Sequence, residues 1–193
     1  MKLSILIPTL PERKELFANL LNVIHSHIAY CEAWQEVEVM FDSTPKGKLT
    51  TGEKRNELLL RSGGKYVWFV DDDDMILKGA IESILKAADT DCDVMAINGI
   101  MTTNGRQEKR FYHKLGNPYC ASNENGTEIY LRYPNHINPM KREIALQILF
   151  PKQNNFEDKA FADTLRDSGL LKTETIIEAP IYHYRYSTVS KTY

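Results

Sequence analysis

The stretch Gly63-Gly64-Lys65-Tyr66-Val67-Trp68-Phe69-Val70-Asp71-Asp72-Asp73-Asp74 decides the fold class of this 193-residue chain. Residues 66–70 form a short apolar run of β-branched and aromatic residues after two glycines, which is typical of a buried central strand of a parallel sheet. Four carboxylates follow at once. Open α/β sheets bind their ligands beyond the carboxyl ends of such strands. The stretch therefore predicts a ligand site at the end of this strand, with Trp68 in the core.

The four consecutive aspartates, residues 71–74, are called the acid run below. Adjacent carboxylates repel one another unless a positive charge lies among them. A divalent cation that shares a phosphate ligand supplies such a charge, because hard cations prefer oxygen ligands. A solvated acidic loop is the ordinary alternative. The run is enclosed between two apolar segments, residues 66–70 and 75–77, and this favours a binding site.

Composition places the chain among ordinary folded domains. It is 42% hydrophobic and 26% charged with a net charge of −2, which gives no support to a dominant nucleic-acid surface. The three cysteines, Cys31, Cys92 and Cys120, are odd in number and lack metal-site spacing. We therefore expect a reducing compartment and neither a disulfide framework nor a zinc site. No signal peptide or membrane span is recognisable, so a cytoplasmic protein is expected.

The first half of the chain alternates predicted strands and helices, which indicates a parallel sheet with right-handed crossovers. Strands are expected at residues 3–7, 37–41, 66–70 and 94–97, and amphipathic helices at residues 13–28, 51–61 and 78–88. Thr51 is the expected N-cap of the second helix.

The second half has a different pattern. Residues 99–126 indicate short strands and polar loops, with a basic cluster at Arg106, Lys109, Arg110 and Lys114. Helices are expected at residues 141–149 and from about 154 to 167, the latter ending at Gly169, and a strand at residues 175–186. No linker or repeat separates the halves. Residues 1–193 are therefore predicted to form a single domain with a nucleotide-binding half, residues 1–98, and an acceptor-binding half, residues 99–193.

Several segments, in this order, resemble the GT-A glycosyltransferases of the large family two. They are Ser4-Ile5-Leu6-Ile7-Pro8-Thr9, Gly52-Glu53-Lys54-Arg55-Asn56, residues 66–74, Phe156-Glu157-Asp158-Lys159-Ala160-Phe161, and Tyr184-Arg185-Tyr186 with Ser190. The resemblance covers nearly the whole chain, and residues 99–135 depart most from the pattern. It implies an α/β fold of the GT-A (Rossmann-like) type, a mostly parallel sheet flanked by helices. It also implies transfer of a sugar from a nucleotide diphosphate donor, usually UDP-linked, with inversion and with Mn²⁺ or Mg²⁺.

The resemblance further implies roles for residues on the donor side. Asp71-Asp72-Asp73 corresponds to the Asp-X-Asp motif. Asp73 is expected to contact the metal, and Asp71 to help hold the nucleoside or the metal, while Asp72 and Asp74 remain open as ligands. His183 is a candidate further metal ligand, with a structural histidine as the alternative. The residues expected to line the nucleotide pocket are Thr9, Pro11, Glu12, Arg13, Asp42, Arg55, Asn56, Asp71 and Asp72.

On the acceptor side, the resemblance marks Glu157 and Asp158 as the catalytic pair. Asp158 is expected to act as the general base and Glu157 to orient the acceptor or the helix. His136, in a loop between two prolines, is a candidate to face the acceptor. The basic cluster is either a contact for an anionic acceptor or a solvated loop. Glycan, lipid-linked sugar, protein and modified nucleobase acceptors all remain open.

Two other functions fit the sequence less well. A non-catalytic nucleotide-sugar-binding module of a larger transferase would be expected to lose the acceptor-side carboxylate, which this chain keeps as Asp158. A sugar nucleotidyltransferase would need a glycine-rich phosphate loop after the first strand. Here that loop is residues 8–13, and it contains no glycine.

Overall fold

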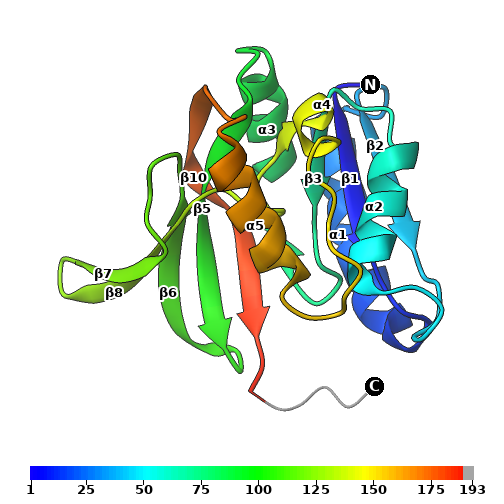
Figure 1. The fold of residues 1–193 in the computed structure, drawn as a ribbon, viewed down its shortest axis with the longest axis horizontal. Helices are drawn as coiled ribbons and strands as arrows, with labels where there is room; N and C mark the ends of the chain where they lie inside the picture. The colour runs from blue at the N-terminus through cyan, green and yellow to red at the C-terminus, as the bar shows by residue number, and fades with distance from the viewer. Residues whose placement is uncertain (189–193) are drawn as a thin grey trace.

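One ten-stranded sheet runs through the computed structural model, which describes residues 1–188 (Figure 1). The strand order is β2-β1-β3-β9-β5-β6-β8-β7; β10 lies beside β5, and β4 lies beside β10. The strands are β1 (Leu3–Pro8), β2 (Val37–Asp42), β3 (Tyr66–Phe69), β4 (Met75–Ile76), β5 (Val94–Thr103), β6 (Arg106–His113), β7 (Cys120–Glu124), β8 (Thr127–Arg132), β9 (Met140–Lys141) and β10 (Glu174–Tyr186).

The predicted α/β class is confirmed, but the sheet is mixed. Strand β1 pairs in parallel with both β2 and β3, as the alternation of strands and helices predicts. Beyond β3 the order changes, because β9 pairs antiparallel with both β3 and β5. Two hairpins, β5–β6 and β7–β8, add further antiparallel pairs. The hairpins are antiparallel because short turns join only antiparallel neighbours. The second half also contains parallel pairs, since β10 lies parallel to β5 and β8 lies parallel to β6.

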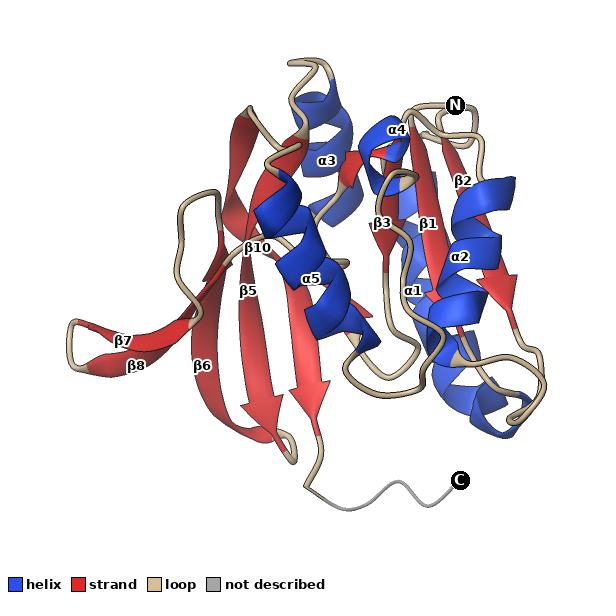
Figure 2. Ribbon diagram, in the orientation of Figure 1, coloured by secondary structure: helices blue, strands red, loops and turns tan. Residues whose placement is uncertain are grey.

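The sheet is covered by helices on both faces (Figure 2). The helical segments are η1 (Pro11–Arg13), α1 (Lys14–Tyr30), α2 (Thr51–Arg61), α3 (Ala80–Ala88), α4 (Arg142–Ala145) and α5 (Glu157–Ser168). One core cluster contains apolar residues of α1 and α3, and the other contains those of α2, α4 and α5. Strand β3 contributes side chains to both core clusters, since Tyr66 and Trp68 pack on one face of the sheet and Val67 and Phe69 on the other. The expectation that Trp68 lies in the core is confirmed.

Most predicted element ends lie within two residues of the observed ones. Helix α5, however, begins at Glu157 instead of about residue 154, strands β4 and β9 were not predicted, and three further differences have a clear cause. The N-cap of α2 is Thr50, not Thr51, because Thr50 and Glu53 form a reciprocal capping box. Strand β5 runs to Thr103 and not to residue 97, since it is extended by pairing with β6 and β10. The helix predicted at residues 141–149 is only the short α4, Arg142–Ala145. Helix α5 ends as predicted at Gly169, which has a φ of 60°.

The fold brings the acid run to the middle of the molecule. The run follows β3 in a turn in which the Asp74 amide donates to the Asp71 carbonyl at 3.0 Å. Strand β4 then pairs with β10, so β10 lies beside the run. Across residues 1–188, no helix combines the length and apolar character needed to cross a membrane.

The loop before α5, residues 150–156, packs on the first turn of α2, and a substitution in that turn can test this packing. A Cβ atom on Gly52 would lie 1.9 Å from the Pro151 carbonyl oxygen, and the Gly52 amide donates to the Gln153 carbonyl at 3.1 Å. Gly52→Ala should therefore lower the free energy of unfolding by about 1–3 kcal/mol, the usual cost of overpacking. Urea unfolding followed by circular dichroism measures this. Glu57→Ala, on the exposed side of the same helix, is the control, and equal stabilities for the two variants would contradict the packing.

Candidate active site

Two cavities meet at the acid run. The first, called the N-terminal cleft, has a volume of about 380 Å³. The second, called the C-terminal cavity, has a volume of about 490 Å³. Asp71 lines both of them, with Asp72 and Asp73 on the cleft side and Asp74 on the cavity side. The strand end predicted as a ligand site therefore separates two hollows of ligand size.

The N-terminal cleft lies at the carboxyl ends of β1 and β3 and at the amino end of α2. This is where an open α/β sheet binds ligands and where helix amide groups favour an anion. Its walls carry more cations than anions, which suits a phosphate group. The lining residues with polar side chains are Thr9, Arg13, Lys46, Thr51, Lys54, Arg55, Asp71, Asp72, Asp73, Asn154 and Asn155.

Asp72 is bound tightly by the protein itself. The Thr9 hydroxyl donates to one carboxylate oxygen at 2.6 Å, and Arg13 donates to the other at 2.5 Å. Burial raises the pKa of Asp72 to about 6, although Thr9 and Arg13 both oppose that rise. Arg13 also donates to Asp73 at 2.9 Å. The Asp72 carboxylate is therefore occupied by hydrogen bonds within the wall of the cleft, whereas the Asp73 side chain keeps 23% of its surface exposed.

Arg55 is a buried guanidinium that joins the two halves of the chain. Only 3% of its side chain is exposed, and its Nη2 atom lies 2.9 Å from Asp71 Oδ1 and 3.4 Å from Glu157 Oε1. Burial alone would raise the pKa of Asp71, but the charge of Arg55 and a hydrogen bond from His136 hold it well below its usual range. Burial raises the pKa of Glu157 against the opposing charge of Arg55. The guanidinium is therefore the positive charge that these acids share.

Aromatic rings fix this guanidinium in place. Its central carbon lies 5.7 Å from the Phe69 ring centroid and 5.5 Å from that of Phe150. Phe150 stacks on Phe161 of α5 with centroids 4.2 Å apart. The Asn56 side chain donates to the Phe150 carbonyl and accepts from the Phe150 amide, each at 2.9 Å. The stack thus holds α5, and the residues at its amino end, against α2 and β3.

Asp74 faces the closing strand instead of the cleft. The Tyr182 hydroxyl donates to its Oδ2 and the Arg185 amide to its Oδ1, both at 2.8 Å. Burial, with the nearby charge of Asp71, raises the pKa of Asp74 well above its usual range. This carboxyl therefore ties the acid run to β10.

A divalent cation fits the cleft only if the protein and a bound phosphate group share its coordination. No group of three or more His, Cys, Asp or Glu side chains arranged for a metal occurs within residues 1–188. Asp71 and Asp73, however, line the same cleft with about a quarter of each side chain exposed, 26% and 23%. Mg²⁺-type sites commonly use one or two carboxylates and take the remaining oxygens from substrate phosphates and water. The donor set therefore fits a cation that arrives with a diphosphate.

The C-terminal cavity contains the predicted base. Asp158, in the first turn of α5, lines it together with Asp71 and His136. The His136 Nε2 atom lies 3.4 Å from Asp71 Oδ2, and the side chain is 6% exposed. Glu157 is buried against Arg55 and lines neither cavity. The two adjacent acids of the predicted catalytic pair thus have different surroundings.

Some predicted site residues lie elsewhere. Pro11 and Glu12 are exposed in η1, and Asp42 accepts from the Thr44 amide at 2.8 Å; none of them lines the cleft, and neither does Asn56. The His183 Nε2 atom lies 2.9 Å from the Thr102 hydroxyl, and this side chain lines neither cavity. Ser190 lies outside the described residues. The basic cluster, Arg106, Lys109, Arg110 and Lys114, lies along β6 and after it and lines neither cavity.

Other lining residues were not predicted. Lys46, Asn154 and Asn155 reach the N-terminal cleft from loops, so no periodic pattern marks them. Arg132 and the tyrosines Tyr119, Tyr130 and Tyr133 line the C-terminal cavity from around the β7–β8 hairpin. The pair Asn125-Gly126, both residues with positive φ, is a local turn signal that could have indicated the hairpin itself. No local sequence pattern showed that residues beside this hairpin would line the same cavity as Asp158.

Comparison with known proteins identifies one family and one group of similar folds. The sequence profile of Glycosyl transferase family 2 matches residues 29–149. No curated protein sequence matches the chain.

Among solved structures, S. aureus TarS 1–349 in complex with UDP-GlcNAc has a TM-score of 0.66 and 18% identity, covering 96% of this chain and 58% of that one. The same fragment in complex with UDP has a TM-score of 0.66 and 19% identity, covering 97% and 61%. A structure titled S. aureus TarS has a TM-score of 0.64 and 19% identity, covering 96% and 37%. These likenesses show the fold, and this chain spans 37% to 61% of those TarS chains.

The Arg55 ion group generates a stability prediction. Arg55→Met leaves the buried Glu157 and the partly buried Asp71 without their shared cation and should lower the free energy of unfolding by about 3–5 kcal/mol. Adding Glu157→Gln removes one of these uncompensated charges and should restore part of the loss. Urea unfolding measures both effects. Arg61→Met, at the exposed end of the same helix, is the control. A double variant less stable than Arg55→Met alone would show that the pair is not coupled in this way.

Proposed function

Because the chain belongs to glycosyl transferase family 2, we propose that it is a metal-dependent enzyme that transfers a sugar from a UDP-linked donor to an acceptor hydroxyl with inversion. The observation that carries this proposal is the meeting of two ligand-sized cavities at Asp71, with Asp158 in the second. The first half of the chain, residues 1–98, would supply most of the donor site. Residues 99–193 would supply most of the acceptor site.

The N-terminal cleft suits the diphosphate of the donor. Lys54 is 3% exposed, donates to the Thr9 carbonyl at 2.6 Å, and lines the cleft near Arg55. Both cations lie on the first turns of α2, where the helix dipole also favours an anion. UDP is chosen as the nucleotide because TarS, the similar fold, is described in complexes with UDP and UDP-GlcNAc. Asp42, Glu12 and Pro11 remain candidates for the outer, nucleoside end of this site.

The proposed transfer step uses both cavities, with the donor in one and the acceptor in the other. The acceptor oxygen forms a bond to the anomeric carbon of the sugar, the bond from that carbon to the diphosphate oxygen breaks, and UDP leaves. The proton of the acceptor hydroxyl passes to the Asp158 carboxylate. A single displacement of this kind inverts the anomeric centre. Asp158 suits the role of base because it lines the acceptor side, whereas Glu157 is occupied with Arg55.

A divalent cation, Mn²⁺ or Mg²⁺, would be held by Asp73 and Asp71, with donor phosphate oxygens as further ligands. When bound, such a cation neutralises charge that develops on the leaving diphosphate. Two arginines of the protein hold these carboxylates: Arg13 lies 2.9 Å from Asp73, and Arg55 lies 2.9 Å from Asp71. These arginines orient the two carboxylates before the donor arrives.

Metal-dependent donor binding is the first expected outcome. Isothermal calorimetry should show that UDP binds in the presence of Mn²⁺ or Mg²⁺ and that chelation weakens binding at least about tenfold, which is about 1.4 kcal/mol. Asp73→Asn should lose most of this metal-dependent affinity while folding normally. Asp89→Asn, an exposed carboxylate after α3, should behave like the wild type. Equal UDP affinity with and without metal would contradict the role of the metal.

The second expected outcome concerns the base. Asp158→Asn should leave metal-dependent UDP binding intact and lower kcat at least about a hundredfold, because general-base help contributes about 10²–10⁴-fold. Glu157→Gln should lower kcat less. UDP release in the presence of an acceptor measures both. If Asp158→Asn turns over normally while Glu157→Gln does not, the assignment within the pair is wrong; if both turn over normally, the base lies elsewhere.

A further inference from the structure

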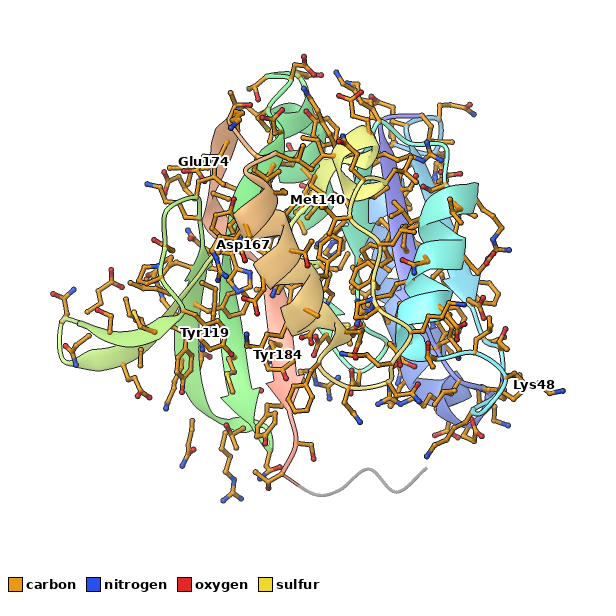
Figure 3. The ribbon with its side chains drawn as sticks, in the orientation of Figure 1. Lys48, Tyr119, Met140, Asp167, Glu174 and Tyr184 are labelled. Carbon is orange, nitrogen blue, oxygen red and sulfur yellow. The ribbon has the colours of Figure 1, made fainter. Side chains whose placement is uncertain are left out.

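Exposed tyrosines gather at the C-terminal cavity. Of the four exposed tyrosines in residues 1–188, Tyr119, Tyr184 and Tyr186 line this cavity, and only Tyr30 lies apart from it. Tyr119 precedes β7 and is 72% exposed, whereas Tyr184 belongs to β10, and Figure 3 labels both side chains. Large aromatic rings left in water at one place are typical of a binding surface. This cavity therefore presents ring faces from elements far apart in sequence.

Arg132 fixes two of the tyrosines at the base of the β7–β8 hairpin. Its guanidinium carbon lies 3.8 Å from the Tyr119 ring centroid and 5.1 Å from that of Tyr130. Its Nη1 atom donates to the carbonyls of Cys120 and Leu131, both at 2.8 Å. Within residues 1–188, no carboxylate pairs with Arg132. The three side chains, called the hairpin stack, therefore form a platform that exists before any ligand binds.

The hairpin stack and the proposed base line the same cavity from different elements. Asp158 comes from α5, and the stack comes from the ends of β7 and β8. At about 490 Å³ the cavity has the size of sites that enclose a substantial small molecule. An acceptor that presents its hydroxyl to Asp158 would extend toward the stack.

The chemistry of the walls selects the class of acceptor. An aromatic face is electron-rich and attracts C–H groups, while tyrosine hydroxyls and the amides of Asn117 and Asn135 serve hydroxyl groups at the edge. A sugar ring has both features. A phosphate-rich chain is disfavoured, because Lys159 and Arg166 in the wall are both paired with Asp163. The third cation of the wall, Arg132, already donates to two backbone carbonyls and packs on the tyrosine rings. Asp71 and Asp158 add negative charge to the same walls.

We propose that the C-terminal cavity binds a neutral carbohydrate acceptor of at least two sugar residues. One sugar presents its hydroxyl to Asp158, and the next lies on the hairpin stack of Tyr119, Tyr130 and Arg132. The inference rests on the proposed function, since it names the acceptor of the same transfer. The basic cluster on β6 does not line this cavity, although its Lys109 donates to the Tyr130 hydroxyl at 3.1 Å and pairs with Glu128.

A glycan array tests the proposal. The wild-type protein, loaded with UDP and Mn²⁺, is applied to immobilised neutral mono- and oligosaccharides, to phosphorylated and uronate-containing glycans, and to single-stranded oligonucleotides. We expect retention on neutral di- and longer saccharides to exceed that on the matching monosaccharides at least about tenfold. Tyr119→Ala and Arg132→Met should each remove most of that difference. Tyr30→Ala, the exposed tyrosine of α1, should leave it unchanged.

Each other result overturns the proposal. Retention on anionic glycans or oligonucleotides alone, equal retention of mono- and disaccharides, or no retention of any neutral saccharide would do so, as would Tyr119→Ala and Arg132→Met variants that fold normally and retain oligosaccharides fully. Circular dichroism establishes the folding of each variant. UDP binding by the wild type, measured without saccharide, reports separately on the proposed function. If UDP binds and no neutral saccharide is retained, this inference alone fails; if UDP does not bind, the proposed function fails as well.

Discussion

The buried charge of Arg55 is the constraint on which the site depends. A guanidinium out of water is costly unless acids of good geometry surround it. Here those acids come from two distant segments: Asp71 ends the central strand, and Glu157 begins α5. Neither acid can move far without leaving a charge unpaired in the interior. The distance between the acid run and the start of α5 is therefore set by electrostatics as well as by packing.

The four aspartates of the acid run also show how such a sequence is tolerated. Their mutual repulsion suggested from sequence that a cation must lie among them. The turn instead directs neighbouring side chains to different partners: Asp71 to Arg55, Asp72 to Thr9 and Arg13, and Asp74 to Tyr182. The protein thus stabilises most of the run itself. What it leaves partly exposed is Asp73 and one side of Asp71, and this limits where a diphosphate-bound cation would be held.

Local patterns predicted the frame of the molecule and much of the N-terminal cleft. Strand β3 and the acid run were predicted because an apolar run and its polar end lie together in sequence. Arg55 was predicted as a donor contact, but its bond to Glu157 spans 102 residues. No periodic pattern encodes such a contact. The same holds for Asp74 and Tyr182, which are 108 residues apart, and for Asn154 and Asn155, which reach the cleft from a loop.

Helix geometry supports the different roles that the sequence analysis expected for the adjacent acids Glu157 and Asp158. Consecutive residues of an α-helix point about 100° apart. Since Glu157 is drawn inward to Arg55, Asp158 is turned toward the C-terminal cavity. The family match ends at residue 149, before this pair, so the match itself does not choose between them. The buried guanidinium supports Asp158 as the proposed base, because it engages Glu157 and leaves Asp158 to line the cavity with Asp71.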